Sequence, residues 1–265
     1  MNKKITNGVR PIIKALNDVE SKPVTWLWAN RIPVGKLTMI AGDPGLGKST
    51  LTMDIAARVS SGQPWPETPG EINEPGGVIL LSAEDDLGDT IKPRLQAAGA
   101  NMSRIVSLEA IQVKCDDEIQ NKMFSLSTNL NQLKKTMLAV ENCKLIIIDP
   151  ITAYCGATDS HKNAEVRGLL APLSELASEM GVAVLAVSHL NKSNNGPAIY
   201  RMMGSLAFVA SARAAYGVVA DKGDPKRRLF LPIKSNLAPA IGGLAFSIEG
   251  VELRNAAHEY VAPSV

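Results

Sequence analysis

The chain has 265 residues, of which 45% are hydrophobic, and its formal net charge is only +2. This composition supports one sizeable core and excludes a polyelectrolyte, so any nucleic-acid contact must come from local basic loops. The three cysteines, Cys115, Cys143 and Cys155, are far apart and predict neither a disulfide framework nor a zinc site. No apolar run approaches the roughly eighteen residues of a membrane span, so we expect a cytoplasmic protein.

The N-terminal residues 1–23 are expected to be peripheral to a main domain that spans residues 24–265. A modest apolar periodicity within residues 12–19 predicts a short helix lying against that domain. Residues 24–28 alternate in the manner of an edge strand. Trp26 and Trp28 are expected to pack in it rather than to stack on bases.

The stretch from Gly42 to Thr50 fits the Gly-x-x-x-x-Gly-Lys-[Ser/Thr] phosphate loop and lies between an apolar strand at 36–41 and helical spacing at 51–60. Its glycines let backbone N–H groups turn toward a phosphate chain, and the following helix directs its positive dipole end there. Lys48 is expected to reach the β- and γ-phosphates, and Ser49 to bind Mg²⁺. The stretch predicts a nucleoside triphosphate site, for which the candidate residues are Gly42, Asp43, Pro44, Gly45, Leu46, Gly47, Lys48, Ser49 and Thr50.

The next segment leads to an acidic trio. Residues 61–77 predict a loop; it could contact the base of the nucleotide, although a plain connector is the favoured interpretation. A buried parallel strand is predicted at 77–83, followed by Glu84, Asp85 and Asp86 and a helix at about 90–98. Because open α/β sheets place their chemistry at the carboxyl ends of strands, we favour Glu84 as the general base of hydrolysis. The alternative is that the trio caps the following helix.

Two later apolar strands also end in polar residues. The strand at 144–149 ends in Asp149, which is expected to hold Mg²⁺ on the other side of the phosphates. The strand at 182–187 is followed by Ser188 and His189. His189 either interacts with the γ-phosphate or is a hydrogen-bonded histidine at the end of a strand.

The loop Leu190–Gly204 is long, rich in amides and basic, so it can grip single-stranded nucleic acid or be an ordinary surface loop. Arg213 and Lys234 lie late in the chain and could serve the nucleotide of a neighbouring subunit. The other elements that we expect are a strand at 104–108, helices at 126–141, 165–180 and 205–212, and closing strands at 215–220, 229–234 and 244–248. The alternation predicts an α/β fold, a mostly parallel twisted sheet flanked by helices with a C-terminal antiparallel extension.

The ordered motifs resemble those of a known family. They are Gly-Asp-Pro-Gly-Leu-Gly-Lys-Ser-Thr, Leu-Ser-Ala-Glu-Asp-Asp, Ile-Ile-Ile-Asp-Pro, Ser-His-Leu-Asn-Lys, Arg-x-x-Gly-Ser and Ile-Lys-Ser-Asn-Leu. The series resembles the RecA-like ATPases related to RepA, the hexameric replicative helicase of broad-host-range plasmids, and the AAA-type ATPase domains of phage and integrated elements. The resemblance covers residues 24–250 and implies a RecA-like P-loop core that binds ATP and Mg²⁺.

The same resemblance assigns roles to individual residues. It implies that Glu84 is the catalytic glutamate, that Asp149 is the aspartate on the Mg²⁺ side, and that His189 senses the γ-phosphate. Arg213 corresponds to an arginine finger supplied in trans, and Lys234 to a basic residue that crosses the same interface. The resemblance implies a homo-oligomer, expected to be a hexamer, whose Leu190–Gly204 loop faces single-stranded DNA in a central channel.

Three functions follow as hypotheses. The first is a ring-forming, ATP-driven DNA helicase or translocase of plasmid, phage or mobile-element replication. The second is an ATP-dependent DNA-binding mediator of recombination or repair. The third is a regulatory ATPase switch that acts independently of DNA.

Overall fold

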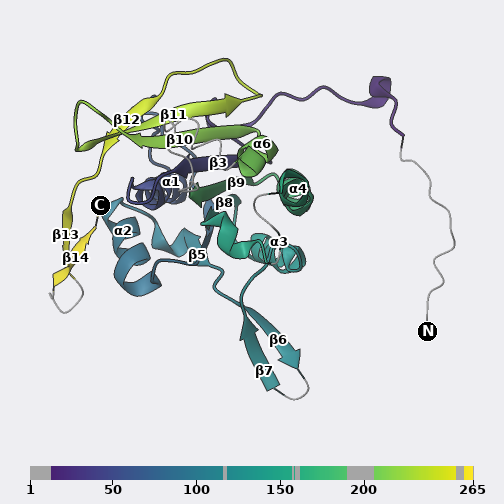
Figure 1. The fold of residues 1–265 in the computed structure, drawn as a ribbon, viewed down its shortest axis with the longest axis horizontal. Coiled ribbons are helices and arrows are strands. Elements are labelled where there is room, and N and C mark those ends of the chain that lie inside the picture. Colours follow the sequence, from purple (N-terminus) through teal and green to yellow (C-terminus); the bar gives the residue numbers. More distant parts are fainter. Residues whose placement is uncertain are drawn as a thin grey trace.

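The computed structural model describes residues 13–115, 118–156, 158, 162–189, 206–254 and 260–264 (Figure 1). Its centre is an eight-stranded sheet. The six strands from β10 to β5 run parallel, and the sheet is extended by β11, which is antiparallel to β10, and by β12, which is antiparallel to β11. In spatial order the strands are β12 (Leu244–Ser247), β11 (Arg227–Ser235), β10 (Ala214–Ala220), β3 (Leu37–Gly42), β9 (Ala183–His189), β8 (Cys143–Asp149), β4 (Gly77–Ser82) and β5 (Ile105–Ser107). The predicted α/β fold with an antiparallel C-terminal extension is confirmed.

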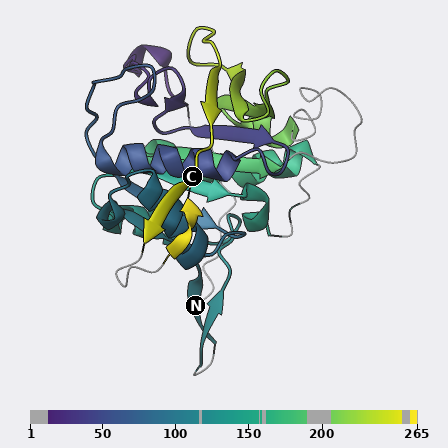
Figure 2. The same ribbon diagram turned by 90° about the vertical axis from the view of Figure 1, so that its left-hand side faces the viewer.

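Helices cover both faces of the sheet, which explains why its central strands are apolar without alternation. In β8, Leu145 and Ile147 face a core shared with α1 and α2, whereas Ile146 and Ile148 face a core shared with α3, α4 and α6. Figures 1 and 2 show these two layers of helices on opposite sides of the sheet. The helices are α1 (Lys48–Ser61), α2 (Lys92–Ala97), α3 (Leu130–Ala139), α4 (Asn163–Met180) and α6 (Leu206–Ser211).

Short turns of helix connect some of these elements. A π-helical turn, η2 (Leu87–Ile91), runs directly into α2, so the helix predicted at 90–98 begins earlier than expected. The 3₁₀ turns are η1 (Leu16–Asp18), η3 (Met102–Arg104) and η4 (Ile151–Tyr154).

The N-terminal part differs from the prediction. Residues 13–25 are all exposed, with Ile13 at 83% and Leu16 at 86% of full exposure, so the predicted packing against the main domain is wrong for the part that the structure describes. The expected edge strand is β1 (Trp26–Trp28), which pairs with β2 (Ile32–Pro33) in a separate two-stranded sheet. Trp28 is buried and stacks on Trp65 with 4.7 Å between ring centroids, which confirms its packing role.

Two hairpins extend the fold. The first, β6 (Ile111–Cys115) with β7 (Glu118–Lys122), was not predicted, and it projects away from the domain in Figure 1. The second, β13 (Val251–Arg254) with β14 (Tyr260–Ser264), follows β12 and contacts α2. Figure 2 shows that the chain reaches this second hairpin by crossing in front of α1. The C-terminal residues therefore return to the part of the molecule that carries the phosphate loop.

Candidate nucleotide-binding site

The phosphate loop joins the carboxyl end of β3 to the amino end of α1, as predicted. Gly45 and Gly47 have φ angles of +77° and +79°, a conformation that residues with a side chain rarely adopt. At Gly42 the restriction is steric, since an added Cβ would lie 2.6 Å from the backbone carbonyl oxygen of Val218. The loop thus has the glycine-dependent backbone that a phosphate cradle needs, and it opens onto the N-terminus of a 14-residue helix.

Lys48 is held inside this loop. Its side chain is 3% exposed, and its Nζ donates a hydrogen bond to the backbone carbonyl of Asp43 at 2.8 Å. Burial lowers the pKa of Lys48, whereas the charges of Asp149, Asp43 and Glu84 act in the opposite direction. A buried ammonium group with acidic neighbours suits the neutralisation of phosphate oxygens.

The order of the strands brings the other predicted residues to the same edge of the sheet. β3, β9, β8 and β4 are neighbours, and all four run parallel. Gly42 is in register with His189, and Ser82 is in register with Asp149. The predicted residues that follow or end these strands are therefore assembled around the phosphate loop.

Asp149 lies beside the hydroxyl that begins α1. It is 6% exposed, and burial raises its pKa, while a hydrogen bond with Ser49 and the charges of His189 and Lys48 oppose the rise. A hydroxyl oxygen and a carboxylate in contact are oxygen donors of the kind that Mg²⁺ uses in nucleotide sites. These residues therefore fit a magnesium ion bound with the phosphates.

Glu84 and His189 face each other at the opening of the site. Their Oε2 and Nε2 atoms are 3.3 Å apart, and the Glu84 side chain is 60% exposed. The other two acids have separate roles: Asp86 caps η2 by accepting hydrogen bonds from two backbone N–H groups, and Asp85 pairs with Arg94 at 2.8 Å. Of the acidic trio, Glu84 is thus the member that lies near Lys48 and His189 beside the phosphate loop.

Arg213 and Lys234 lie at the opposite end of the sheet. The backbone N–H of Arg213 donates to the carbonyl of Leu37, at the amino end of β3. Lys234 Nζ donates to the carbonyls of Ala210 and Ala212 at 2.8 and 2.7 Å. Both residues line a cavity of about 500 Å³, together with two cations that the sequence analysis did not single out, Lys36 and Arg167.

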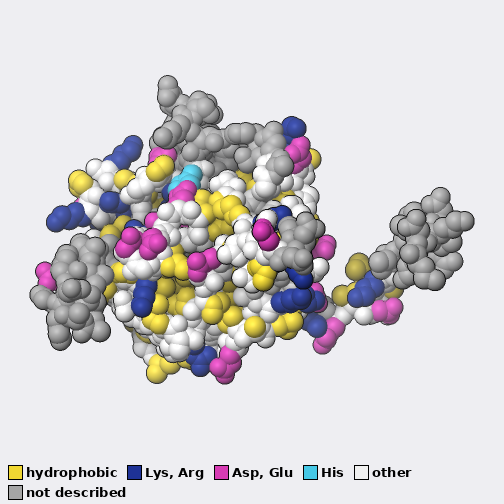
Figure 3. Space-filling model, turned by 90° about the horizontal axis from the view of Figure 1, so that it is seen from below, with side chains coloured by type: hydrophobic (Ala, Val, Ile, Leu, Met, Phe, Trp, Pro, Cys, Tyr) yellow, Lys and Arg dark blue, Asp and Glu magenta, His cyan; other side chains and the backbone are white. Residues whose placement is uncertain are grey.

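The predicted DNA-contacting loop, Leu190–Gly204, lies outside the described residues, as do His161 and His258. On the underside of the molecule, Figure 3 shows acidic and basic side chains interspersed, so the described part of this face presents no extended basic surface. No helix in the described part of the chain is long and apolar enough to cross a membrane.

Sequence reasoning missed a set of residues next to the phosphate loop. Phe246 and Ile248, at the end of β12, lie against Gly47: an added Cβ there would be 2.2 Å from Ile248 Cδ1 and 3.9 Å from Phe246 Cε2. No local pattern in the sequence indicates this contact, because some 200 residues separate the two segments.

The fold and the loop together define a RecA-like P-loop ATPase. Comparison with known proteins agrees: the AAA domain family matches residues 11–195, and the chain belongs to this family.

Several curated proteins that are similar to this chain are DNA repair proteins named RadA. The DNA repair protein RadA of Bacillus subtilis (strain 168) is 25% identical over 171 residues, which cover 64% of this chain and 31% of that protein. RadA of Halalkalibacterium halodurans is 23% identical over 175 residues (66% and 32%), and RadA of Streptococcus pneumoniae is 24% identical over 171 residues (64% and 34%). The chain thus spans about a third of the length of these relatives.

Proposed function

We propose that this chain hydrolyses ATP at interfaces between copies of itself and uses the energy to move on single-stranded DNA, as a ring-forming helicase or translocase. The observation that supports a site shared between copies is the distance between Arg213 and the phosphate loop of the same chain. Arg213 is hydrogen-bonded next to Leu37, five residues along β3 from Gly42. Five residues of parallel strand span about 16 Å, which an arginine side chain cannot cover, so Arg213 cannot serve its own phosphate loop.

The charge of the amino end of the sheet supports the same proposal. Lys36, Arg167 and Arg213 take part in no ion pair among the described residues. One acidic residue, Glu175, also lines the cavity, but burial and the charges of Arg213 and Arg167 lower the pKa of Lys234, so repulsion between cations dominates at Lys234. A neighbouring copy that offers bound phosphates would relieve this repulsion, and a head-to-tail arrangement of copies brings the two ends together.

The proposed reaction uses the side chains already described. Glu84 orients a water molecule and takes its proton as the water oxygen bonds to the γ-phosphorus, while the bond to the bridging oxygen breaks and leaves ADP. Lys48 stabilises the charge on the phosphate oxygens, and His189, in contact with Glu84, reports the presence of the γ-phosphate. Ser49 and Asp149 would hold Mg²⁺, which would supply further charge neutralisation.

The DNA-directed part of the proposal rests on the sequence and the relatives. The basic Leu190–Gly204 loop is the segment that we expect to contact single-stranded DNA. The motif series resembles RepA-type helicases of plasmids and phages, which favours replication of a mobile element.

The similarity to DNA repair proteins named RadA favours a second candidate, an ATP-dependent mediator of recombination or repair. A DNA-independent regulatory switch is the third.

One experiment separates these functions. ATPase rate, particle size and unwinding of a forked duplex are measured with and without single-stranded DNA, for wild type and Lys48→Ala. A motor predicts oligomers, stimulation by DNA, and unwinding that Lys48→Ala abolishes. Stimulation and DNA binding without unwinding would favour the mediator. An ATPase rate that no nucleic acid changes would contradict both and favour the switch.

A further inference from the structure

A cavity of about 540 Å³ lies beside the first turns of α1, next to the phosphate loop, and neither Glu84 nor Asp149 lines it. One wall is α1, which contributes Thr50, Leu51 and Asp54; another is the C-terminal segment from Phe246 to Val251. This volume lies within the range of about 300–1,000 Å³ that small-molecule sites occupy.

The cavity adjoins the phosphate loop. Thr50 directly follows Ser49, and the opposite wall touches the loop, since Ile248 and Phe246 are the side chains nearest to Gly47. A triphosphate held by the backbone of the loop therefore has this cavity as an adjoining space for its sugar and base.

The surfaces deep in the cavity are apolar and partly aromatic. Leu51 and Phe246 face it from the two walls, and Trp28 and Phe230, which stack with 6.1 Å between ring centroids, lie at its inner end. A planar base gains most from such surfaces through stacking and van der Waals contact.

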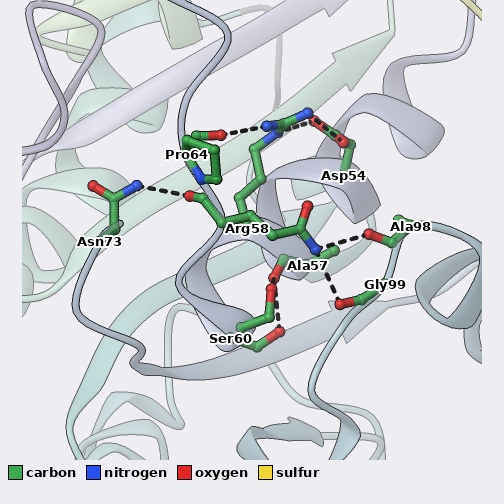
Figure 4. Close-up of polar contacts among 10 residues, drawn as sticks. Asp54, Ala57, Arg58, Ser60, Pro64, Asn73, Ala98 and Gly99 are labelled. Carbon is green, nitrogen blue, oxygen red and sulfur yellow. Dashed lines mark hydrogen bonds and ion pairs between the residues drawn. The ribbon is translucent and has the colours of Figure 1, made fainter. Parts of the chain in front are cut away.

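Three polar side chains of the walls, Asp54, Arg58 and Gln63, already have partners within the protein. The Arg58 guanidinium donates to the Asp54 carboxylate at 2.8 and 3.1 Å and to the carbonyl of Pro64. Gln63 donates its amide to the carbonyls of Ala98 and Gly99 at 3.2 and 3.0 Å. Figure 4 shows this network tying the end of α1 to the loop after it and to the end of α2. These groups fix the walls; of the other polar side chains, Thr50 follows Ser49 at the phosphate-loop end of the cavity, and Ser247 and Glu249 are at the exposed rim.

We propose that this cavity binds the ribose and base of the nucleoside triphosphate, and that it holds the base by apolar and aromatic contact with little discrimination between adenine and guanine. This inference rests on the proposed nucleotide site at Lys48. A site that reads a base through dedicated hydrogen bonds can discriminate by 10⁴–10⁵-fold, whereas apolar pockets reach only about 10–200-fold. The loop at 61–77, which contributes Gln63 and Pro66, then does more than connect two elements.

The test compares the Mg²⁺ complexes of ATP, GTP and inorganic tripolyphosphate by calorimetry. In wild type we expect ATP and GTP to bind within about tenfold of each other, and both to bind at least about tenfold more tightly than tripolyphosphate. Phe246→Ala should weaken ATP and GTP alike by about fivefold or more and leave tripolyphosphate within about twofold. Leu231→Ala is the control, because this half-buried residue lies on the adjoining strand and does not line the cavity.

Several results would overturn the inference. Wild type binding tripolyphosphate as tightly as ATP would show that the base makes no useful contact, and a preference above about 200-fold for one base would show a hydrogen-bonded site. Equal losses for ATP and tripolyphosphate in Phe246→Ala would place its effect on the phosphate loop. Failure of wild type to bind tripolyphosphate and both nucleotides would instead contradict the proposed function itself.

Discussion

The proposed active site, shared between neighbouring subunits, predicts that two inactive variants restore each other. Lys48→Ala removes the lysine that neutralises the phosphates, and Arg213→Ala removes a cation worth about 10³–10⁵ in rate when it acts as an arginine finger. Each variant alone should be nearly inactive. In mixed oligomers, however, a subunit with an intact phosphate loop can meet a neighbour with an intact Arg213.

The magnitude follows from counting interfaces. In an equal, random mixture, half of the subunits keep Lys48 and half of their neighbours keep Arg213, so about one quarter of the sites are complete. We therefore expect about one quarter of the wild-type ATPase rate if sites act independently. The rate is measured by phosphate release after the two chains are co-expressed and purified together.

A matched control separates complementation from simple dilution. In this control, a chain that carries both Lys48→Ala and Arg213→Ala is mixed with the Arg213→Ala chain. The mixture contains intact phosphate loops but no chain with Arg213, so it should stay inactive. A mixture of the two single variants that shows only the sum of their residual rates would refute the reasoning. So would an Arg213→Ala protein that hydrolyses ATP normally by itself.

The remaining predictions concern stability. Gly42→Ala forces a Cβ against the Val218 carbonyl and should reduce the free energy of unfolding by about 1–3 kcal/mol in urea titrations. Gly168→Ala, on the exposed face of α4 with open space around it, should instead raise the free energy of unfolding by about 0.5–1 kcal/mol, and equal effects of the two would contradict the packing at Gly42. Burial raises the pKa of Asp149 in the folded protein. The contribution of this carboxyl group to the stability of the fold is therefore present at low pH and is lost as pH rises through the raised pKa. Without nucleotide, Asp149→Asn should therefore have a higher free energy of unfolding than wild type at pH 8, and the difference should shrink toward pH 4. A difference that does not change with pH would mean that the substitution acts through packing and not through the charge.

The parts of the site that local patterns encode were predictable. The apolar strand that ends in Asp149, the strand before Glu84 and the glycine spacing of the phosphate loop each depend on a few adjacent residues. The strand order that gathers these ends depends on the whole sheet, and it follows from the sequence only through the alternation of strands and helices.

Other features had no local signal. The contact of Ile248 with Gly47 joins segments at opposite ends of the domain, so no periodicity indicates it. The hairpin of β6 and β7 was missed because β7 is exposed along its whole length and is polar apart from Ile119, without the apolar alternation of a half-buried strand. At the N-terminus the reverse holds: Ile13 and Leu16 have helical spacing but are exposed, since spacing alone does not provide a surface to pack against.

The most direct test of the account is a crystal structure with Mg²⁺ and a non-hydrolysable ATP analogue. The account predicts phosphates surrounded by the backbone N–H groups of residues 45–49, Lys48 on the β- and γ-phosphate oxygens, and the metal ion between Ser49 and Asp149. A nucleotide bound elsewhere, or phosphates in the loop with the metal ion away from Asp149, would contradict it.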